Sequence, residues 1–310
     1  MGTEFVQLSL TPMLIGILAA IACALPGNFL ILRRQALIGD AISHVVLPGI
    51  VVAFLITGTI STWPMIFGAA AASIVAVIII EAIRRFGKIE PGAAMGVTFT
   101  SMFAAGVLLL EQSDTSSVHI DVEHALYGNL ESLIWLEAEG WHSLIDPVAL
   151  ATLPDELTRM AAVAVLIGIG TWVFWRPLKI STFDETFANS IAIPVSAVGF
   201  GLVVSAAIAA VAAFDAVGSI IVIAMFICPP AAARLMTNRL ELQIMWSILF
   251  ATLSAILGYL FAGYGPQWVG LDNAVSAAGM IATVSGVILA LACCLAPHRK
   301  RLGATENLGQ

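Results

Sequence analysis

The sequence predicts an all-α fold: one transmembrane domain over residues 1–310, a helical bundle that crosses a membrane about eight or nine times. The first observation is composition, because 60% of the residues are hydrophobic and 11% are charged, with a mean hydropathy of +1.00. A soluble domain of this length carries about 25% charged residues. The second is that apolar runs of roughly 20 residues, enough to cross a ~30 Å hydrocarbon core, recur along the chain. The third is that basic residues gather in alternate loops.

The apolar runs define the candidate spans in order. They lie at about residues 12–32, 38–57, 63–86, 91–111, 158–177, 194–213, 215–236, 240–262 and 273–296. Each run is long enough for a transmembrane helix. The boundary between the sixth and the seventh is the least distinct, because Asp215 stands there with almost no loop around it.

Loop charges give these spans an orientation, since Lys and Arg accumulate on the cytoplasmic side of membrane proteins. With the N-terminus outside, the inner segments hold all but one of the 13 basic residues, and Arg159 is the exception. The C-terminal tail, residues 297–310, is then expected in the cytoplasm. The inner basic residues are Arg33, Arg34, Arg84, Arg85, Lys88, Arg176, Lys179, Arg234, Arg239, Arg299, Lys300 and Arg301.

The longest polar segment, residues 112–157, is external in this orientation and acidic. From Glu111 onward it holds ten acidic residues and no basic residue before Arg159. Its stretch ESLIWLEAEGWHSLIDP mixes Trp, Leu and Glu, as in amphipathic segments that lie at the lipid–water interface. Nothing in the chain is basic enough to indicate nucleic-acid binding, and no Walker-type G-x-x-x-x-G-K-[ST] motif occurs. An ATPase that drove transport would be another chain.

Two ionisable residues enter the second span together, in IGDAISHVVLPGI at residues 38–50. Ionisable groups inside a span cost about 2.5–3.5 kcal/mol each on insertion scales, so each is a candidate for function. The i, i+4 spacing puts Asp40 and His44 on one helix face, where their oxygen and nitrogen atoms can share a divalent ion such as Mn, Fe or Zn. The alternatives are an Asp–His hydrogen bond that packs two helices, or an N-cap aspartate near a core histidine.

Prolines interrupt two of the spans, as Pro48-Gly49 in the second and Pro229-Pro230 in the seventh. Pro48-Gly49, four residues after His44, is expected to break or kink its helix and to open backbone carbonyls toward a pathway. Pro229-Pro230 is expected to break the seventh span near its inner end. Around Asp215 two interpretations stay open: a tight hairpin with a proline kink, or a discontinuous segment that lines a pathway and whose freed backbone groups are covered by protein or water.

A second group of candidate ligands lies in the external segment, within SVHIDVEHALYGNL. His119, Asp121, Glu123 and His124 are spaced so that they can bind a cation or raise its local concentration by attraction. A solvated acidic loop without a site has the same composition, so the residues alone leave both interpretations open.

Four segments carry motifs in a fixed order: LRRQALIGDAISHVVLPGIVVAF, VEHALYGNLE, FDETFANSIAIP and VGSIIVIAMFICPPAAARLM. Together they resemble the ABC-3 family, the membrane permeases of bacterial manganese, zinc and iron ABC importers. The resemblance spans about residues 10–296, and four ordered motifs make it specific. The chain departs from the pattern at Glu185, where proline is usual, and at Ala192, where glycine is usual. The long external segment and HIDVEHALYGNLE favour the manganese/iron branch.

The resemblance implies a multi-pass permease of the bacterial cytoplasmic (inner) membrane that is not itself an enzyme and holds no permanent cofactor. Family members pair with a second permease subunit, identical or related, and cytoplasmic ABC ATPase subunits drive them. A periplasmic or lipid-anchored binding protein delivers the metal ion. Transferred onto this sequence, the metal-handling pair is Asp40 and His44, and the expected cargo is Mn²⁺, with Fe²⁺ or Zn²⁺ as alternatives. A permease for a chelated ligand shares this architecture but has no need of the pair.

An ion-coupled secondary metal transporter is the alternative from another class. Such a protein is expected to show matched half-repeats with intramembrane carboxylates in both halves. Asp40 has no evident counterpart in the second half, where Asp215 stands at a membrane boundary.

Residues 180–193 are expected to form a short cytoplasmic helix. Asp184 and Glu185 stand early in it, and Phe183, Phe187 and Ile191 form an apolar face at i, i+4 and i+8. From the residues alone this is an interfacial helix. The family resemblance makes it a coupling helix that docks into a groove of the ATPase.

Overall fold

The computed structural model describes residues 2–58, 62–112, 128, 130–268, 270 and 275–295. Within these ranges the regular secondary structure is helical, and nine helices or helix halves are long and apolar enough to cross a membrane. The prediction of an all-α polytopic bundle is therefore confirmed. The ends of these candidate spans lie within four residues of the predicted ones, except that the first span begins earlier, at Val6, and runs to Leu32.

The helices vary from single turns to a rod of 42 residues. In chain order they are α1 (Gly2–Phe5), the π-helical η1 (Val6–Leu10), α2 (Thr11–Leu32), α3 (Ile38–Thr57), α4 (Thr62–Gly87), α5 (Pro91–Gln112), the 3₁₀ turns η2 (Leu130–Ser132) and η3 (Trp141–Leu144), α7 (Pro147–Leu150), α8 (Asp155–Val173), α9 (Trp175–Phe183), α10 (Glu185–Ser190), α11 (Val195–Met236), α12 (Leu240–Trp268) and α13 (Ala277–Leu295).

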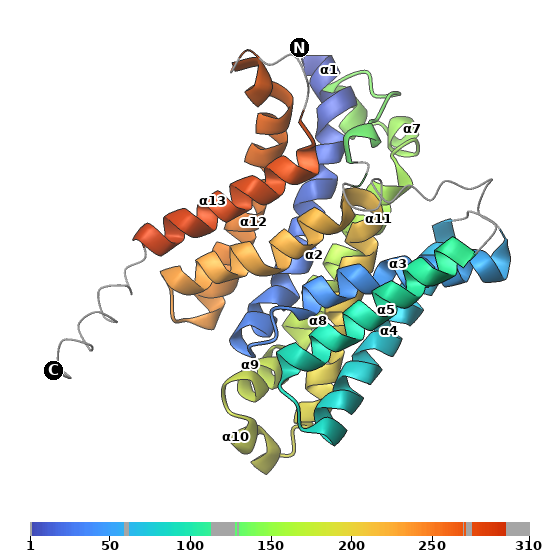
Figure 1. Ribbon diagram of the computed structural model, residues 1–310. Helices are drawn as coiled ribbons and strands as arrows, with labels where there is room; N and C mark the ends of the chain where they lie inside the picture. The colour runs from blue at the N-terminus through green and yellow to red at the C-terminus, as the bar shows by residue number, and fades with distance from the viewer. Residues whose placement is uncertain are drawn as a thin grey trace.

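Helix α2 forms the centre of the bundle and packs against α8, α11 and α12 (Figure 1). Its buried face is rich in alanine and glycine, which lets neighbouring backbones approach closely. Helices α3, α4 and α5 pack against one another as a group, and α3 and α4 also pack against α11. Figure 1 shows α9 and α10 at the same end of the molecule as the turn between α4 and α5.

Helix α11 bends where the sequence predicts the boundary between two spans. Gly218 leaves the helical region, with φ 77° and ψ 170°, a conformation open to glycine because it has no Cβ atom. The two halves of α11 meet there at a sharp bend in Figure 1. The prediction of a break at Pro229-Pro230 was wrong, because both prolines lie inside the helix and the non-helical residue is Gly218.

The group α3–α4–α5 is held together by backbone contacts at glycines. A Cβ atom placed on Gly49 would lie 2.5 Å from the carbonyl oxygen of Gly68 and 2.8 Å from Cα of Ala69. One placed on Gly106 would lie 2.6 Å from Cβ of Pro48. Helix α3 therefore touches α4 and α5 with no space for a methyl group at either contact.

Replacing Gly49 with alanine is expected to destabilise the protein, although Gly→Ala inside a helix is favourable in other settings. The new methyl group must push α3 and α4 apart, at a cost of about 1–3 kcal/mol. Thermal unfolding of the purified protein in detergent measures this as a lower midpoint. Gly96→Ala in α5 is the matched control, because the space around a Cβ atom there is open. An unchanged midpoint for Gly49→Ala would contradict the close packing.

Candidate functional site

A tight turn between α2 and α3 places Asp40 at the start of a membrane helix. Arg34 adopts the left-handed conformation, with φ 57°. The amide of Gln35 donates to the carbonyl oxygen of Leu30 at 2.8 Å, and the amide of Ile38 donates to that of Gln35 at 3.0 Å. Asp40 therefore stands in the first turn of α3, where the helix dipole favours a negative charge.

Asp40 and His44 lie together, as their spacing predicts. Nε2 of His44 is 3.3 Å from Oδ1 of Asp40. The side chain of His44 is 36% exposed and that of Asp40 is 27% exposed. The pair is thus neither sealed in the core nor fully open. The surrounding helices remove part of the water around it and leave part of both side chains exposed.

Helix α5 holds the imidazole ring of His44 in place. The ring stacks on Phe99 with centroids 5.3 Å apart and planes 21° apart. It meets Phe103 edge-on, with centroids 5.9 Å apart. The sequence analysis did not single out these phenylalanines, although their i, i+4 spacing marks one face of α5. They limit rotation of the ring and so fix the direction in which its nitrogen atoms point.

The pair offers two protein ligands. Across the described ranges, no three His, Cys, Asp or Glu side chains form a group able to hold a metal ion. A carboxylate oxygen and an imidazole nitrogen suit a divalent first-row ion, and structural metal sites close around four ligands. With two ligands, the arrangement is that of a weak, open cation site and not of a closed structural metal centre.

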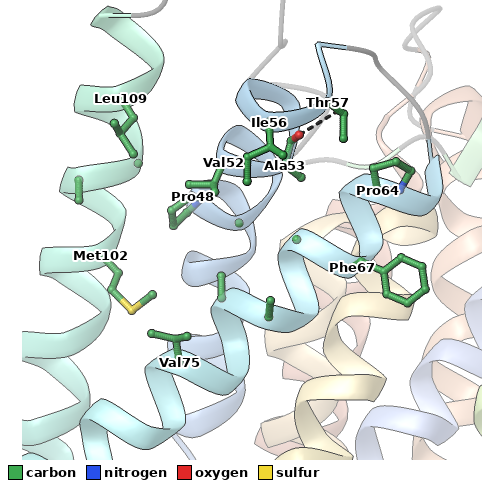
Figure 2. Close-up of a pocket in the computed structure, with 16 residues that line it drawn as sticks. Pro48, Val52, Ala53, Ile56, Thr57, Pro64, Phe67, Val75, Met102 and Leu109 are labelled. Carbon is green, nitrogen blue, oxygen red and sulfur yellow. Dashed lines mark hydrogen bonds between the residues drawn. The ribbon is translucent and has the colours of Figure 1, made fainter.

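An apolar pocket of about 630 Å³ lies next to the pair, one turn further along α3. Figure 2 shows residues that line it from three helices: Pro48 and Val52 of α3, Met102 and Leu109 of α5, and Val75 of α4. The hydroxyl of Thr57, a polar group in the lining, donates to the carbonyl oxygen of Ala53 at 2.9 Å. This apolar lining offers a divalent cation few ligands. Helix α3 is not broken at Pro48-Gly49, because it stays helical through both residues.

The predicted coupling segment is divided into two helices. Helix α9 ends at Phe183 and α10 begins at Glu185, with Asp184 extended between them at φ −148°. Oδ1 of Asp184 accepts a hydrogen bond from the amide of Phe187 at 2.8 Å, which makes Asp184 an N-cap. The expectation of one continuous helix over 180–193 was therefore wrong. Aspartate's preference for N-cap positions is the sequence signal that indicates the break.

The break leaves the predicted apolar residues at the surface. Phe183, Phe187 and Ile191 are 54%, 52% and 47% exposed. Ala192, just after α10, has φ 61°, a left-handed conformation that glycine adopts without strain. The resemblance places glycine as the usual residue at this position, and glycine would adopt this conformation without strain.

The four external candidates, His119, Asp121, Glu123 and His124, lie outside the described residues. Two described residues further along, Gly128 and Glu131, contact the bundle. A Cβ atom on Gly128 would lie 2.5 Å from the amide nitrogen of Gly218, at the bend of α11. Oε1 of Glu131 accepts a hydrogen bond from the amide of Ala277, at the start of α13.

Comparison with known proteins settles the family. The family model described as the ABC 3 transport family matches residues 5–137 and 147–296. The chain belongs to this family. The resemblance of the four motifs is thereby confirmed. With nine candidate spans among the described residues, this ABC-3 protein is a multi-pass protein of the bacterial cytoplasmic membrane.

Individual relatives of this ABC-3 protein cover most of its length. It is 38% identical over 282 residues to the manganese transport system membrane protein MntD of Bacillus subtilis, which covers 91% of this chain and 90% of MntD. It is 35% identical over 284 residues to the zinc transport system membrane protein TroD of Treponema pallidum, covering 92% of this chain and 73% of TroD. The solved structure of PsaBC from Streptococcus pneumoniae in complex with a Fab matches with a TM-score of 0.74 and 29% identity, over 95% of this chain and 94% of that one.

Proposed function

We propose that this ABC-3 protein is the permease of a binding-protein-dependent ABC importer that moves Mn²⁺ into the cytoplasm, driven by ATP hydrolysis on a separate subunit. The observation that carries the proposal is the Asp40–His44 pair, a carboxylate and an imidazole 3.3 Å apart at the start of a membrane helix. The similarity to MntD, named for manganese transport, supports the choice of metal.

In this proposal the pair is a transient station for the ion. The carboxylate of Asp40 attracts the cation and supplies an oxygen ligand, and neutral His44 supplies a nitrogen lone pair. Phe99 and Phe103 keep the imidazole directed toward that place. Two protein ligands hold an ion loosely enough to release it, and conduction requires sites that bind and also let go.

In this proposal, partner chains act at both ends of the path that the ion takes through the permease. We assign to the external His119, Asp121, Glu123 and His124 the role of attracting cations from a periplasmic or lipid-anchored binding protein. At the other end, the exposed Phe187 of α10 and its apolar neighbours fit a groove of the cytoplasmic ABC ATPase subunit. A second permease subunit, identical or related, completes the channel, and no permanently bound cofactor is needed.

Zinc is the second candidate cargo, because the zinc protein TroD is 35% identical to this chain. Zn²⁺ and Fe²⁺ accept the same oxygen and nitrogen ligands as Mn²⁺. The pair therefore suits all three ions, and the preference for Mn²⁺ rests on the similarity to MntD.

Metal accumulation in cells with and without the gene tests the proposal. We expect deletion to lower the uptake of radioactive ⁵⁴Mn at trace concentration, and plasmid-borne wild type to restore it. Uptake of iron and zinc measured in the same cells assigns the cargo. If deletion lowers zinc or iron uptake and leaves manganese unchanged, the choice of Mn²⁺ is wrong. If no metal responds, the permease proposal itself fails.

A further inference from the structure

A guanidinium group connects the end of α2 to the base of the coupling segment. Nη2 of Arg33 donates to Oγ of Ser181 at 2.7 Å, and Nε donates to Oγ1 of Thr182 at 3.1 Å. The partners are 148 and 149 residues away along the chain. The planar fork of arginine reaches two hydroxyl groups at once, which a lysine ammonium on a flexible stem does not reproduce.

The connection lies in a partly dry place. Burial lowers the pKa of Arg33, and the carboxylate of Glu185 offsets only part of this effect. The guanidinium stays charged at neutral pH. Hydrogen bonds from a charged donor are stronger than neutral ones, and a low local dielectric strengthens them further. The hydrogen bonds from Arg33 to α9 are therefore strong enough to make the end of α2 move together with α9.

Both ends of the connection lead directly to functional positions. Ser181 and Thr182 stand in the last turn of α9, just before Asp184, whose carboxylate caps α10. Arg33 follows the last residue of α2, and its own amide donates to the carbonyl oxygen of Phe29 at 3.0 Å. Beyond it, the tight turn described above runs into α3 and reaches Asp40 within seven residues.

A cavity lies between α10 and α4, beside the Arg33 connection. It has a volume of about 910 Å³ and lies between Glu185 and Asn189 of α10, Glu81 and Arg84 of α4, and the start of α11. Arg33 and Thr182 form part of its wall. Since α10 and α4 face each other across empty volume, α10 can shift without first displacing α4.

We infer that Arg33 is a positioning residue that passes the movement of α10 to the Asp40–His44 pair. When the ATPase moves α10, the bonds to Ser181 and Thr182 pull the α2–α3 turn, and the turn carries the first helical turn of α3 with it. This inference rests on the proposed function, because it needs the ATPase partner. It adds a defined mechanical link between the coupling surface and the metal pair.

The test uses the full transporter, this chain with its ATPase subunit, in nanodiscs or vesicles, with its binding protein and Mn²⁺. ATP hydrolysis and ⁵⁴Mn transport are measured together, and their ratio is the readout. We expect Arg33→Gln to lower the Mn²⁺ transported per ATP about tenfold, within the usual range of coupling between sites. The pair of changes Ser181→Ala and Thr182→Val should do the same, and combining them with Arg33→Gln should add little. Arg34→Gln, in the same turn, is the control and should leave the ratio unchanged.

The outcomes separate the possible failures. If Arg33→Gln lowers hydrolysis and transport in parallel, with an unchanged ratio, the residue is only structural and the inference is overturned. A wild-type ratio, or full additivity of the changes on α2 and α9, overturns it as well. If the wild-type transporter itself moves no Mn²⁺, the proposed function fails before Arg33 is tested. Arg33→Lys should restore part of the ratio, because it keeps the charge but loses the fork.

Discussion

Uptake of Mn²⁺ is expected to be lost when Asp40 or His44 is replaced by alanine. Each change removes one of the two ligand side chains and leaves the other alone in a partly dry site. Removing a residue that only supports a metal ligand typically costs 10- to 100-fold, so the loss of a ligand itself should cost about 100-fold or more. Accumulation of ⁵⁴Mn in cells that carry the variant as their sole copy measures the effect.

Assembly must be followed alongside uptake. Both variants are expected to copurify with the ATPase subunit in normal amounts, because the two side chains are partly exposed and are not part of the tightly packed core. His142→Ala is the matched control: this histidine lies in η3, is exposed, and should have no effect. Normal Mn²⁺ uptake by both Asp40→Ala and His44→Ala would exclude the ligand role.

Replacing Phe187 with aspartate is expected to uncouple ATP hydrolysis from transport. Phe187 is 52% exposed on α10, and a charge in its place would have to be desolvated inside an apolar groove of the ATPase. Loss of such a contact lets the ATPase run without moving α10. We expect hydrolysis by the reconstituted complex to continue and Mn²⁺ transport to fall about tenfold or more, a coupling loss of over 1 kcal/mol.

Phe86→Asp provides the comparison for this change. Phe86 is 90% exposed near the end of α4 and lies outside the α9–α10 segment. Its replacement adds the same charge and should leave transport per ATP as in the wild type. If Phe187→Asp behaves like Phe86→Asp, then α10 is not the surface on which the ATPase docks.

Much of the fold follows from the sequence because a bilayer demands long apolar helices. Hydropathy located the nine spans within a few residues, and the boundary at Asp215 falls beside the bend of α11. The bend itself was misplaced. Proline is a strong helix breaker, yet α11 stays helical through Pro229-Pro230, and it is Gly218 that takes the non-helical conformation. The bend at Gly218 lies in close contact with Gly128, about 90 residues earlier, and local sequence patterns do not encode a contact at that separation.

The candidate site was predictable only in part. The spacing of Asp40 and His44 placed them on one face, and their contact at 3.3 Å agrees with it. The stacking of His44 on Phe99 depends on how α3 and α5 pack, which local patterns do not encode. The link from Arg33 to Ser181 is of the same kind, because it joins residues 148 positions apart.

The glycine contacts of α3 bear on how this chain can evolve. Since Gly49 and Gly106 leave no volume for even one methyl group, the distance between α3 and its neighbours is not open to gradual adjustment. A mutation that widens the helix spacing would cost stability before it changed the ligands. A change in the environment of His44 is therefore more accessible through the side chains of Phe99 and Phe103, which contact the imidazole.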